Sequence, residues 1–368
     1  MGSNEYLKLK DLDKFGMLNF IEKAPDYLRL TLNLIKSGEV NWSKNLENLE
    51  GLKVENVLIS GLGGSAISGD IIVDWIWEKS SIPIIVNRDY KLPQFAGEKT
   101  VVITVSYSGN TFETLNQFYE AYKRKCILFS VSSGGKLMKA SERLKIPFLK
   151  VKESLPPRAA LPCLLPAVTY ILSKFEHSIL ISELEAAANK MDEVKKEVGF
   201  HRKVEENPAK KMALNIIGKY PVIYAFANMG SVARRIKDQI NENSKVSAKF
   251  DFLPEACHNE IEGTFFPVKE NLCFLFIEPQ EKIEKVISEE FKKVLRENGF
   301  INIYDIPVKG ETKIEKILTS IYFGDFTSFY LSLAYNVDPT VTKNIQKYKN
   351  GVSEEASKLI NYFESLIL

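Results

Sequence analysis

The hydrophobic pattern of this chain alternates short apolar runs with amphipathic segments. In the first half, runs rich in β-branched residues predict strands at 54–60, 82–86, 100–105 and 127–131. Charged residues recur among apolar ones between these runs, which predicts helices ending near Trp77, at 111–123 and near 136–144. Strands that alternate with helices in this way form a parallel sheet with helices on both faces.

Further helical patterns flank this first sheet. Two amphipathic helices are expected before about Val40, and two more, at 164–175 and 179–198, follow the break at Pro156-Pro157. The alternation then restarts, with strands expected at 221–226, 272–277 and 301–307 and helices at 230–241, 281–298 and 312–335. The turn at 225–231 resembles the first unit's Gly-Ser turn in degenerate form, so we interpret the second half as a copy of the same fold. A last amphipathic helix is expected at 352–368.

We therefore predict an α/β chain with two flavodoxin-like, doubly wound parallel-sheet subdomains and flanking helices. A chain of 368 residues exceeds the size at which one hydrophobic core usually stops growing, which also favours two domains. The predicted segments are N-terminal helices packing on the core at 1–50, a first subdomain at 51–155, linking helices at 156–210, a second subdomain at 211–335 and a C-terminal helical segment at 336–368.

Two loops rich in glycine and hydroxyl side chains follow the first and third predicted strands. They read Gly61-Leu62-Gly63-Gly64-Ser65-Ala66 and Ser106-Tyr107-Ser108-Gly109-Asn110-Thr111. A strand that ends in such residues before a helix offers backbone N–H groups, the positive end of the helix dipole and hydroxyl donors. We predict that both loops bind one phosphate group, with Gly63 shaping the first loop and contacts from Gly64, Ser65, Ser106, Ser108 and Thr111.

Two other interpretations of these loops remain open. The first loop satisfies the dinucleotide fingerprint G-x-G-x-x-G/A, and Arg88 or Asp89 after the second strand could meet the ribose end of a nicotinamide cofactor. Ser65 and the second hydroxyl cluster favour phosphate instead, because a dinucleotide loop needs only its backbone. The second loop could also be a solvated turn, with Thr111 as the N-cap of the next helix.

Composition and charge limit the possible partners. Lysine plus arginine number 49 and aspartate plus glutamate 47, a formal charge of +2 that gives no reason to expect a nucleic-acid or membrane partner. No apolar run approaches the roughly 20 residues that span a bilayer, and Met1–Tyr6 has no apolar signal core. We expect a soluble cytoplasmic protein without a metal, whose four widely spaced cysteines are buried reduced thiols: Cys126, Cys163, Cys257 and Cys273.

Several motifs resemble a known family. Gly-Gly-Ser after the first strand and Ser-Tyr-Ser-Gly-Asn-Thr-Phe-Glu-Thr after the third are similar to the sugar isomerase domain, which binds phosphosugars. Further segments make the chain similar to the archaeal-type bifunctional phosphoglucose/phosphomannose isomerases of the phosphoglucose isomerase superfamily: 157–160, 241–245, 254–260 and 335–340, with Lys347 beyond. The resemblance covers most of the chain in the family's order, although the stretch after Lys347 looks longer than usual.

The resemblance implies a metal-independent, cofactor-free aldose–ketose isomerase that converts fructose 6-phosphate to glucose 6-phosphate and mannose 6-phosphate through an enediolate. It implies that Glu242 is the base and that Arg158 stabilises the enediolate. His258 would open the sugar ring from the partner subunit of a homodimer, Lys347 would assist at the ring oxygen, and Thr340 would leave room for rotation about C2–C3. It also implies a cytoplasmic enzyme of carbohydrate metabolism, in glycolysis and gluconeogenesis.

Residue type and position alone also allow plainer roles. Glu242 could be a solvated carboxylate at a helix end, Arg158 a surface residue at a domain junction, and Thr340 the cap of a helix that begins there. His258, one of three histidines, could be structural, and Lys347 could lie on a solvated basic face. A non-catalytic phosphosugar sensor is the alternative from another class, but a sensor does not need Glu242, His258, Arg158 and Lys347 together.

Overall fold

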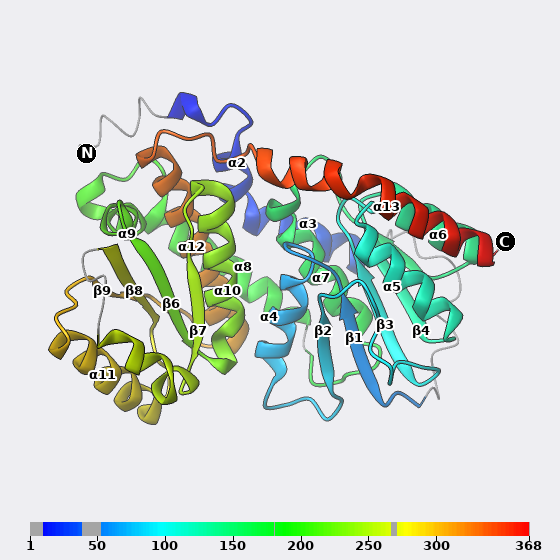
Figure 1. The fold of residues 1–368 in the computed structure, drawn as a ribbon, viewed down its shortest axis with the longest axis horizontal. Helices are drawn as coiled ribbons and strands as arrows, with labels where there is room; N and C mark the ends of the chain where they lie inside the picture. The colour runs from blue at the N-terminus through cyan, green and yellow to red at the C-terminus, as the bar shows by residue number, and fades with distance from the viewer. Residues whose placement is uncertain (1–9, 39–52, 180, 266–270, 368) are drawn as a thin grey trace. The chain divides into compact units, whose positions relative to one another are not determined.

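The computed structural model describes residues 10–38, 53–179, 181–265 and 271–367, so much of the predicted N-terminal segment, Met1–Tyr6 included, lies outside the described residues. The chain forms two compact units, each around one parallel sheet (Figure 1). The first-sheet unit comprises Ala24–Glu185 and Thr342–Leu368. The second-sheet unit comprises Met1–Lys23 and Ala186–Val341.

The first sheet has five parallel strands in the order β2-β1-β3-β4-β5. The strands are β1 (Asn56–Ser60), β2 (Ile84–Asn87), β3 (Thr100–Val105), β4 (Ile127–Ser132) and β5 (Phe148–Lys150). This is the flavodoxin-like order, which confirms the predicted fold class. The pattern analysis missed β5, because three residues at the edge of a sheet are too few to show an alternation.

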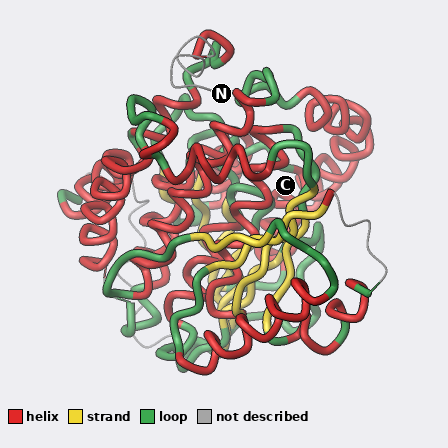
Figure 2. Tube along the Cα trace, turned by 90° about the vertical axis from the view of Figure 1, so that its left-hand side faces the viewer, coloured by secondary structure: helices red, strands yellow, loops and turns green. Residues whose placement is uncertain are grey.

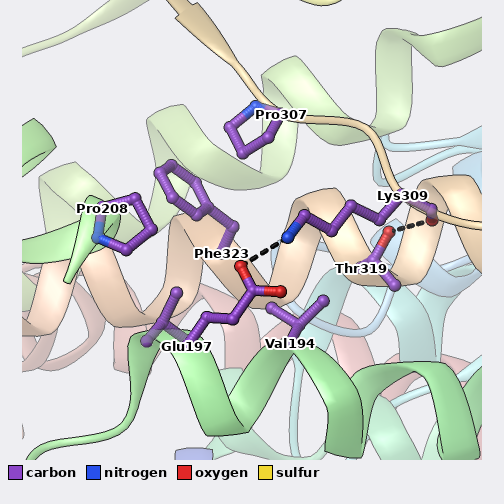
Figure 3. Close-up of a pocket in the computed structure, with 8 residues that line it drawn as sticks. Val194, Glu197, Pro208, Pro307, Lys309, Thr319 and Phe323 are labelled. Atoms are coloured by element: carbon purple, nitrogen blue, oxygen red, sulfur yellow. Dashed lines mark hydrogen bonds and ion pairs between the residues drawn. The ribbon is translucent and has the colours of Figure 1, made fainter. Parts of the chain in front are cut away.

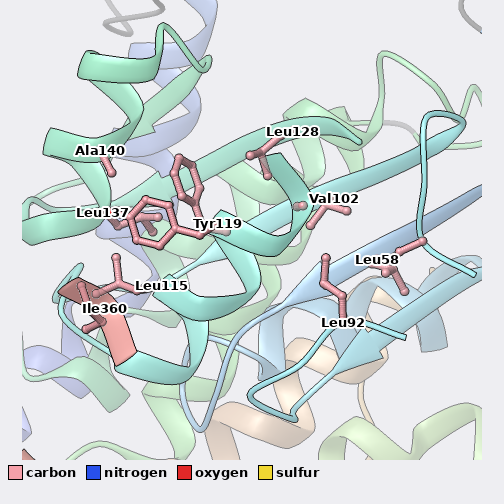
Figure 4. Close-up of a cluster of buried hydrophobic side chains, with 12 residues drawn as sticks. Leu58, Leu92, Val102, Leu115, Tyr119, Leu128, Leu137, Ala140 and Ile360 are labelled. Atoms are coloured by element: carbon pink, nitrogen blue, oxygen red, sulfur yellow. The ribbon is translucent and has the colours of Figure 1, made fainter. Parts of the chain in front are cut away.

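Helices cover both faces of this sheet. α5 (Phe112–Lys123) and α6 (Gly135–Leu144) contact each other and β4, whereas α4 (Ile67–Ile76) contacts β2 and α7 (Leu161–Leu172). Leu58, Val102 and Leu128 are neighbours across three strands and form one buried cluster with side chains of α5 and α6 (Figure 4). Ile360 joins this cluster from α13 (Lys343–Ile367), which begins earlier than the predicted C-terminal helix. On the other side, α7 packs on α3 (Ala24–Lys36).

The second sheet has four parallel strands in the order β7-β6-β8-β9, which repeats the order of the first four strands of the first sheet. The strands are β6 (Tyr220–Phe226), β7 (Lys249–Leu253), β8 (Leu272–Ile277) and β9 (Ile303–Ile306). The shared order supports the interpretation that the second half copies the first. Neither β7 nor the helix α9 (Pro208–Ile216) was predicted. β7 is a half-buried edge strand with charges among its apolar residues, which hides the strand pattern.

Helices and loops surround the strands (Figure 2). In the second-sheet unit, buried helices and aromatic rings fill the core. α12 (Lys313–Ala334) is buried on almost every side and contacts α9, α10 (Gly230–Gln239) and α2 (Met17–Glu22). A Cβ atom at Gly324 would lie 2.3 Å from Cγ1 of Ile236, so only glycine lets α10 and α12 approach this closely. Arg235 holds the same two helices together with paired hydrogen bonds to Asp325, of 3.1 Å from Nε and 3.0 Å from Nη2. α11 (Lys282–Glu297) packs against the other face through Phe291.

Lys210 on α9 is a buried cation in this unit, with 2% of its surface exposed. Its Nζ donates hydrogen bonds of 2.7 Å to the carbonyl oxygens of Phe200 and Arg202. The same nitrogen lies 5.2 Å from the ring centroids of Phe200 and Tyr330, which favours the charged form. Burial outweighs this effect and lowers the pKa of Lys210 from 10.5 to about 8. The lysine therefore joins α9 to the loop that follows α8 (Ile181–Val198).

Replacing Lys210 by Met tests this assignment through the pH dependence of stability. The folded-state pKa of Lys210 lies below its ordinary value, so between about pH 8 and pH 10 the unfolded chain binds more protons than the folded chain. Wild-type stability should therefore rise across this window, relative to the Lys210→Met variant, by about 1–2 kcal/mol after solvent screening. Urea unfolding of both proteins at pH 7.5 and 9.5 measures the difference, and parallel pH profiles would contradict the assignment.

Candidate active site

The two glycine and serine loops lie at the point where the strand order of the first sheet reverses. β1 and β3 are parallel neighbours, and the helices that follow them, α4 and α5, cover opposite faces. Crevices of this kind, at the carboxyl ends of parallel strands, are the usual ligand sites of such sheets. The loops touch directly, because the N–H of Tyr107 donates a 3.2 Å hydrogen bond to Oγ of Ser65. A Cβ atom at Gly61 would lie 2.7 Å from the carbonyl oxygen of Val105, so close contact also requires glycine there.

The second loop holds its hydroxyl groups in a fixed arrangement before α5. Oγ of buried Ser106 donates a 3.1 Å hydrogen bond to Oγ1 of Thr111, and the hydroxyl of exposed Ser108 accepts one of 3.3 Å from the N–H of Asn110. Thr111 takes the N-cap position of α5 but its side chain makes no capping hydrogen bond. Thr111 is therefore the N-cap residue, as expected, but its hydroxyl bonds with the serine cluster and not with the start of the helix.

The first loop packs against the segment that carries Arg158. A Cβ atom at Gly64 would lie 3.1 Å from the carbonyl oxygen of Pro157 and 3.2 Å from Cα of Arg158. Gly63 has a positive φ of 52°, which suits its expected part in shaping the loop. Arg158 is buried rather than on the surface, with 4% of its surface exposed, in the short helical turn η3 (Pro157–Ala159). The first-sheet unit therefore brings an arginine to the edge of the two loops.

The residues that a nicotinamide cofactor would need are engaged elsewhere. Arg88 forms an ion pair with Asp70 of α4. Asp89 accepts a 2.6 Å hydrogen bond from the N–H of Tyr90 and so stabilises its own turn. Neither side chain is held ready for a ribose, which counts against the dinucleotide interpretation of the first loop.

Glu242 lies in η6 (Ile240–Ser244), a π-helical turn that continues α10. Such turns are rare and are frequent at functional sites. Asn243 and Ser244 fix the turn on α12. Nδ2 of Asn243 donates a 3.0 Å hydrogen bond to Oγ of Ser328. Oγ of Ser244 donates one of 2.7 Å to the carbonyl oxygen of Ser328. The glutamate is thus half-buried on a rigid support, not at a freely solvated helix end.

Thr340 lies near the same turn, joined to it by a lysine that sequence reasoning missed. Nζ of Lys245 donates hydrogen bonds to the carbonyl oxygens of Glu242 and Pro339. Lys245 itself has a positive φ of 61°, a conformation that is uncommon for lysine and cannot be predicted from the sequence. Thr340 donates its N–H to Asp338 over 2.8 Å and does not begin a helix, because α13 starts at Lys343. Its suggested role as a helix cap was therefore wrong.

His258 lies apart from Glu242 within the second-sheet unit. It ends the exposed turn η7 (Glu255–His258), which follows the carboxyl end of β7. α10 instead runs back from the carboxyl end of β6, so Glu242 lies near the amino ends of the strands. Ala256 of the same turn joins the buried cluster of Tyr224 and Phe291 on the α11 face of the sheet, whereas the turn of Glu242 is held on α12. Lys347 is exposed on α13, in the first-sheet unit.

A separate cavity of about 200 Å³ in the second-sheet unit does not contain any of these residues (Figure 3). Apolar side chains form most of its wall, and its charged groups, Glu197 and Lys309, pair with each other. Thr319 donates its hydroxyl to the carbonyl oxygen of Lys309 over 2.6 Å. Because these polar groups already have partners, the cavity offers little to recognise a phosphosugar.

The four cysteines are free, and in the described ranges no cluster of three His, Cys, Asp or Glu side chains could hold a metal ion. Cys163 and Cys273 are buried, which raises their pKa values to about 11 and about 12. Cys126 and Cys257 are only half-buried, which corrects the expectation that all four are buried. No helix in the described part of the chain is long and apolar enough to cross a membrane.

Comparison with known proteins defines the class of this protein. Residues 205–352 match the bacterial phospho-glucose isomerase C-terminal SIS domain. The structure of tagatose-6-phosphate ketose/aldose isomerase from Escherichia coli superposes with a TM-score of 0.70 at 14% identity, over 89% of this chain and 95% of that one. The superposition shows that this chain has the fold of that isomerase, and its second half matches a sugar isomerase (SIS) domain.

Sequence relatives define the family within this class. The bifunctional phosphoglucose/phosphomannose isomerase of Caldicellulosiruptor bescii is 32% identical over 317 residues, 84% of this chain and 94% of the relative. The protein of the same name from Aquifex aeolicus is 30% identical over 322 residues, 86% of this chain and 96% of the relative. The chain belongs to the bifunctional phosphoglucose/phosphomannose isomerase family, as its motifs had indicated.

Gly109 provides a test of the loop geometry. Its φ is +67°, and a Cβ atom there would lie 1.8 Å from the carbonyl oxygen of Gly134. Gly109→Ala should lower the free energy of unfolding by about 2 kcal/mol or more and weaken phosphate binding about tenfold, because the hydroxyl groups of the loop are displaced. Thermal unfolding and calorimetric titration with inorganic phosphate measure both effects.

Gly97 is a matched control, since a Cβ atom there would meet nothing within 4 Å. Gly97→Ala should leave phosphate affinity at the wild-type value. If Gly109→Ala bound phosphate as tightly as wild type, the second loop would not be part of the phosphate site.

Proposed function

We propose that this protein is an aldose–ketose isomerase that interconverts fructose 6-phosphate with glucose 6-phosphate and with mannose 6-phosphate. The observation that carries the proposal is the packing of the Arg158 turn against the first hydroxyl-rich loop, which is itself hydrogen-bonded to the second. The loops alone would serve a sensor of phosphosugars. A buried arginine beside them adds a positive charge where negative charge develops during isomerisation.

The two loops would bind the phosphate group of the sugar. Ser65, Ser106, Ser108 and Thr111 offer hydroxyl groups, and Gly64 offers its half-buried backbone, in the loops that precede α4 and α5. Neutral donors at helix N-termini are sufficient to bind a phosphate dianion, so phosphate binding requires no lysine in either loop. Arg158 would stabilise the enediolate.

Glu242 would move the proton between C1 and C2 of the open-chain sugar. A well-placed carboxylate base contributes about 10² to 10⁴ in rate. Its support from Ser328 through Asn243 and Ser244 suits this role, because a base must hold its position against both carbon atoms. Thr340 would leave room for rotation about C2–C3, so that the same base can form both aldose epimers. Lys347 would assist at the ring oxygen.

His258 would open the sugar ring, since imidazole can donate and accept a proton near neutral pH. Its turn packs on the α11 face of the second sheet, apart from the α12-bound turn of Glu242, which supports a contribution from the partner subunit of a homodimer. An enzyme with these substrates would act in the cytoplasm, in carbohydrate metabolism at the junction of glycolysis and gluconeogenesis. The chain then needs neither a cofactor nor a nucleic-acid partner.

Solvent exchange tests the proposed reaction and its base. In D₂O, wild-type protein given fructose 6-phosphate should place deuterium at C2 of both glucose 6-phosphate and mannose 6-phosphate, as measured by NMR. Glu242→Gln should lower exchange by about 10³-fold or more, because the amide cannot accept the proton. Its affinity for inorganic phosphate should stay near wild type, since the loops are unchanged.

The same assay tests Thr340. Thr340→Ala should change the ratio of mannose to glucose product, whereas Glu78→Gln, at an exposed carboxylate outside the proposed site, should change neither rate nor ratio. Exchange retained by Glu242→Gln would show that another group is the base, and an unchanged product ratio would remove the role of Thr340.

Subunit mixing tests the contribution of His258 across the dimer. Glu242→Gln and His258→Ala chains should each be inactive alone. When they are unfolded together and refolded in equal amounts, about half of the dimers would be mixed and each would keep one intact site, which gives about a quarter of wild-type activity. A mixture that stays inactive would place both residues of each site in one chain.

A further inference from the structure

Tyr107 lies between two serines of the second loop and connects three loops through its backbone. Its N–H donates to Oγ of Ser65 in the loop after β1. Its carbonyl oxygen accepts hydrogen bonds from the N–H and the hydroxyl of Ser133, 2.9 and 2.7 Å away, in the loop after β4. The residue thus fixes the loops at the carboxyl ends of three neighbouring strands.

The side chain of Tyr107 makes a separate set of contacts. Only 5% of the residue is exposed. Its hydroxyl accepts a 2.8 Å hydrogen bond from the N–H of Leu155 and donates one of 3.0 Å to the carbonyl oxygen of Lys152. Burial raises the pKa of Tyr107 above its ordinary value, so the phenol stays protonated and able to donate. The ring therefore ties the second loop to the segment 152–155.

This segment leads directly into the Arg158 turn, without a flexible joint. Leu155 is followed by Pro156 and Pro157, whose rings restrict the backbone. The N–H of Ala159 then donates a 2.8 Å hydrogen bond to the carbonyl oxygen of Pro156, and that of Ala160 one of 3.2 Å to Pro157. A constraint applied at Leu155 is transmitted through rigid backbone to Arg158.

We propose that Tyr107 is the positioning residue that sets the Arg158 turn relative to the phosphate-binding loops. Its backbone holds the loops and its hydroxyl holds the turn, so one residue fixes the separation between the bound phosphate and the guanidinium group. The expected effect on kcat rests on the proposed function, in which Arg158 acts on the enediolate. The mechanical link itself can be measured without turnover.

Tyr107→Phe separates the two halves of this role, because it removes the hydroxyl and keeps every backbone hydrogen bond. Hydrogen exchange of the amides of Leu155 and Arg158–Ala160 should become at least about tenfold faster. The kcat for fructose 6-phosphate should fall about tenfold, as should the affinity for a phosphorylated hydroxamate that mimics the enediolate. The inhibition constant of inorganic phosphate should stay within about twofold of wild type.

Tyr330→Phe is a matched control. Tyr330 is also buried and its hydroxyl donates a 2.6 Å hydrogen bond to the carbonyl oxygen of Val198, in the second-sheet unit. This variant should lower Tm to a similar extent and leave kcat, the inhibitor affinities and exchange at 155–160 unchanged. A purely structural role of Tyr107 would make the two variants behave alike, which would overturn the proposal.

Other results would also overturn it. In Tyr107→Phe, the amides at 155–160 could exchange at the wild-type rate, or they could exchange faster while kcat stays at the wild-type value. Either result would show that the hydroxyl does not position Arg158 for reaction. If Tyr107→Phe failed to fold, hydrogen exchange in the wild-type protein would test the link instead. The amides of Tyr107 and Leu155 should then be equally protected from exchange. A Leu155 amide that exchanges freely would contradict the link. A wild-type protein without isomerase activity would refute the proposed function alone, since the exchange measurements would still stand.

Discussion

The site depends on the reversal of strand order between β1 and β3. Because the helices after these two parallel neighbours cover opposite faces, the two loops begin side by side and their backbone N–H groups can face one space. This proximity leaves no room for side chains where the loops cross other backbone, hence glycine at 61 and 109. Ser65 lies in this contact between the loops, and the Arg158 turn packs beside it against Gly64.

The second sheet repeats the strand order without repeating this chemistry. At the start of α11, the carboxylate of Glu284 accepts hydrogen bonds of 2.8 and 3.1 Å from the N–H groups of Gln280 and Glu281. That helix N-terminus therefore already holds an anion of its own. At the start of α5, in contrast, Thr111 makes no side-chain cap. The same fold thus leaves one helix start open to phosphate in the first sheet and neutralises its counterpart in the second.

Sequence patterns were sufficient for most of the fold and for half of the site. Strong alternation located the long strands and helices, whereas β5 and β7 escaped because short or half-buried edge strands carry little pattern. The loops were recognisable because glycine and hydroxyl residues after a strand have a direct physical meaning. Glu242, His258 and Thr340 were found only through family resemblance, since a single carboxylate or imidazole has no local signal. The positive φ of Lys245 and the contact of Tyr107 with the distant residue Leu155 arise from tertiary packing. Local sequence patterns carry no information about such packing.

The division between neutral and charged groups in the first-sheet unit has an energetic reason. Neither loop, 61–66 or 106–111, contains a lysine or arginine. A cation on the phosphate would bind substrate, intermediate and product equally well, and uniform binding of this kind does not raise kcat. A cation beside the loops, on a turn stiffened by Pro156 and Pro157, interacts most strongly with charge that exists only during the reaction. In the proposed mechanism, neutral loops with one fixed arginine would direct electrostatic stabilisation to the enediolate, and the hydrogen bonds of the buried Tyr107 hydroxyl would keep the Arg158 turn in place.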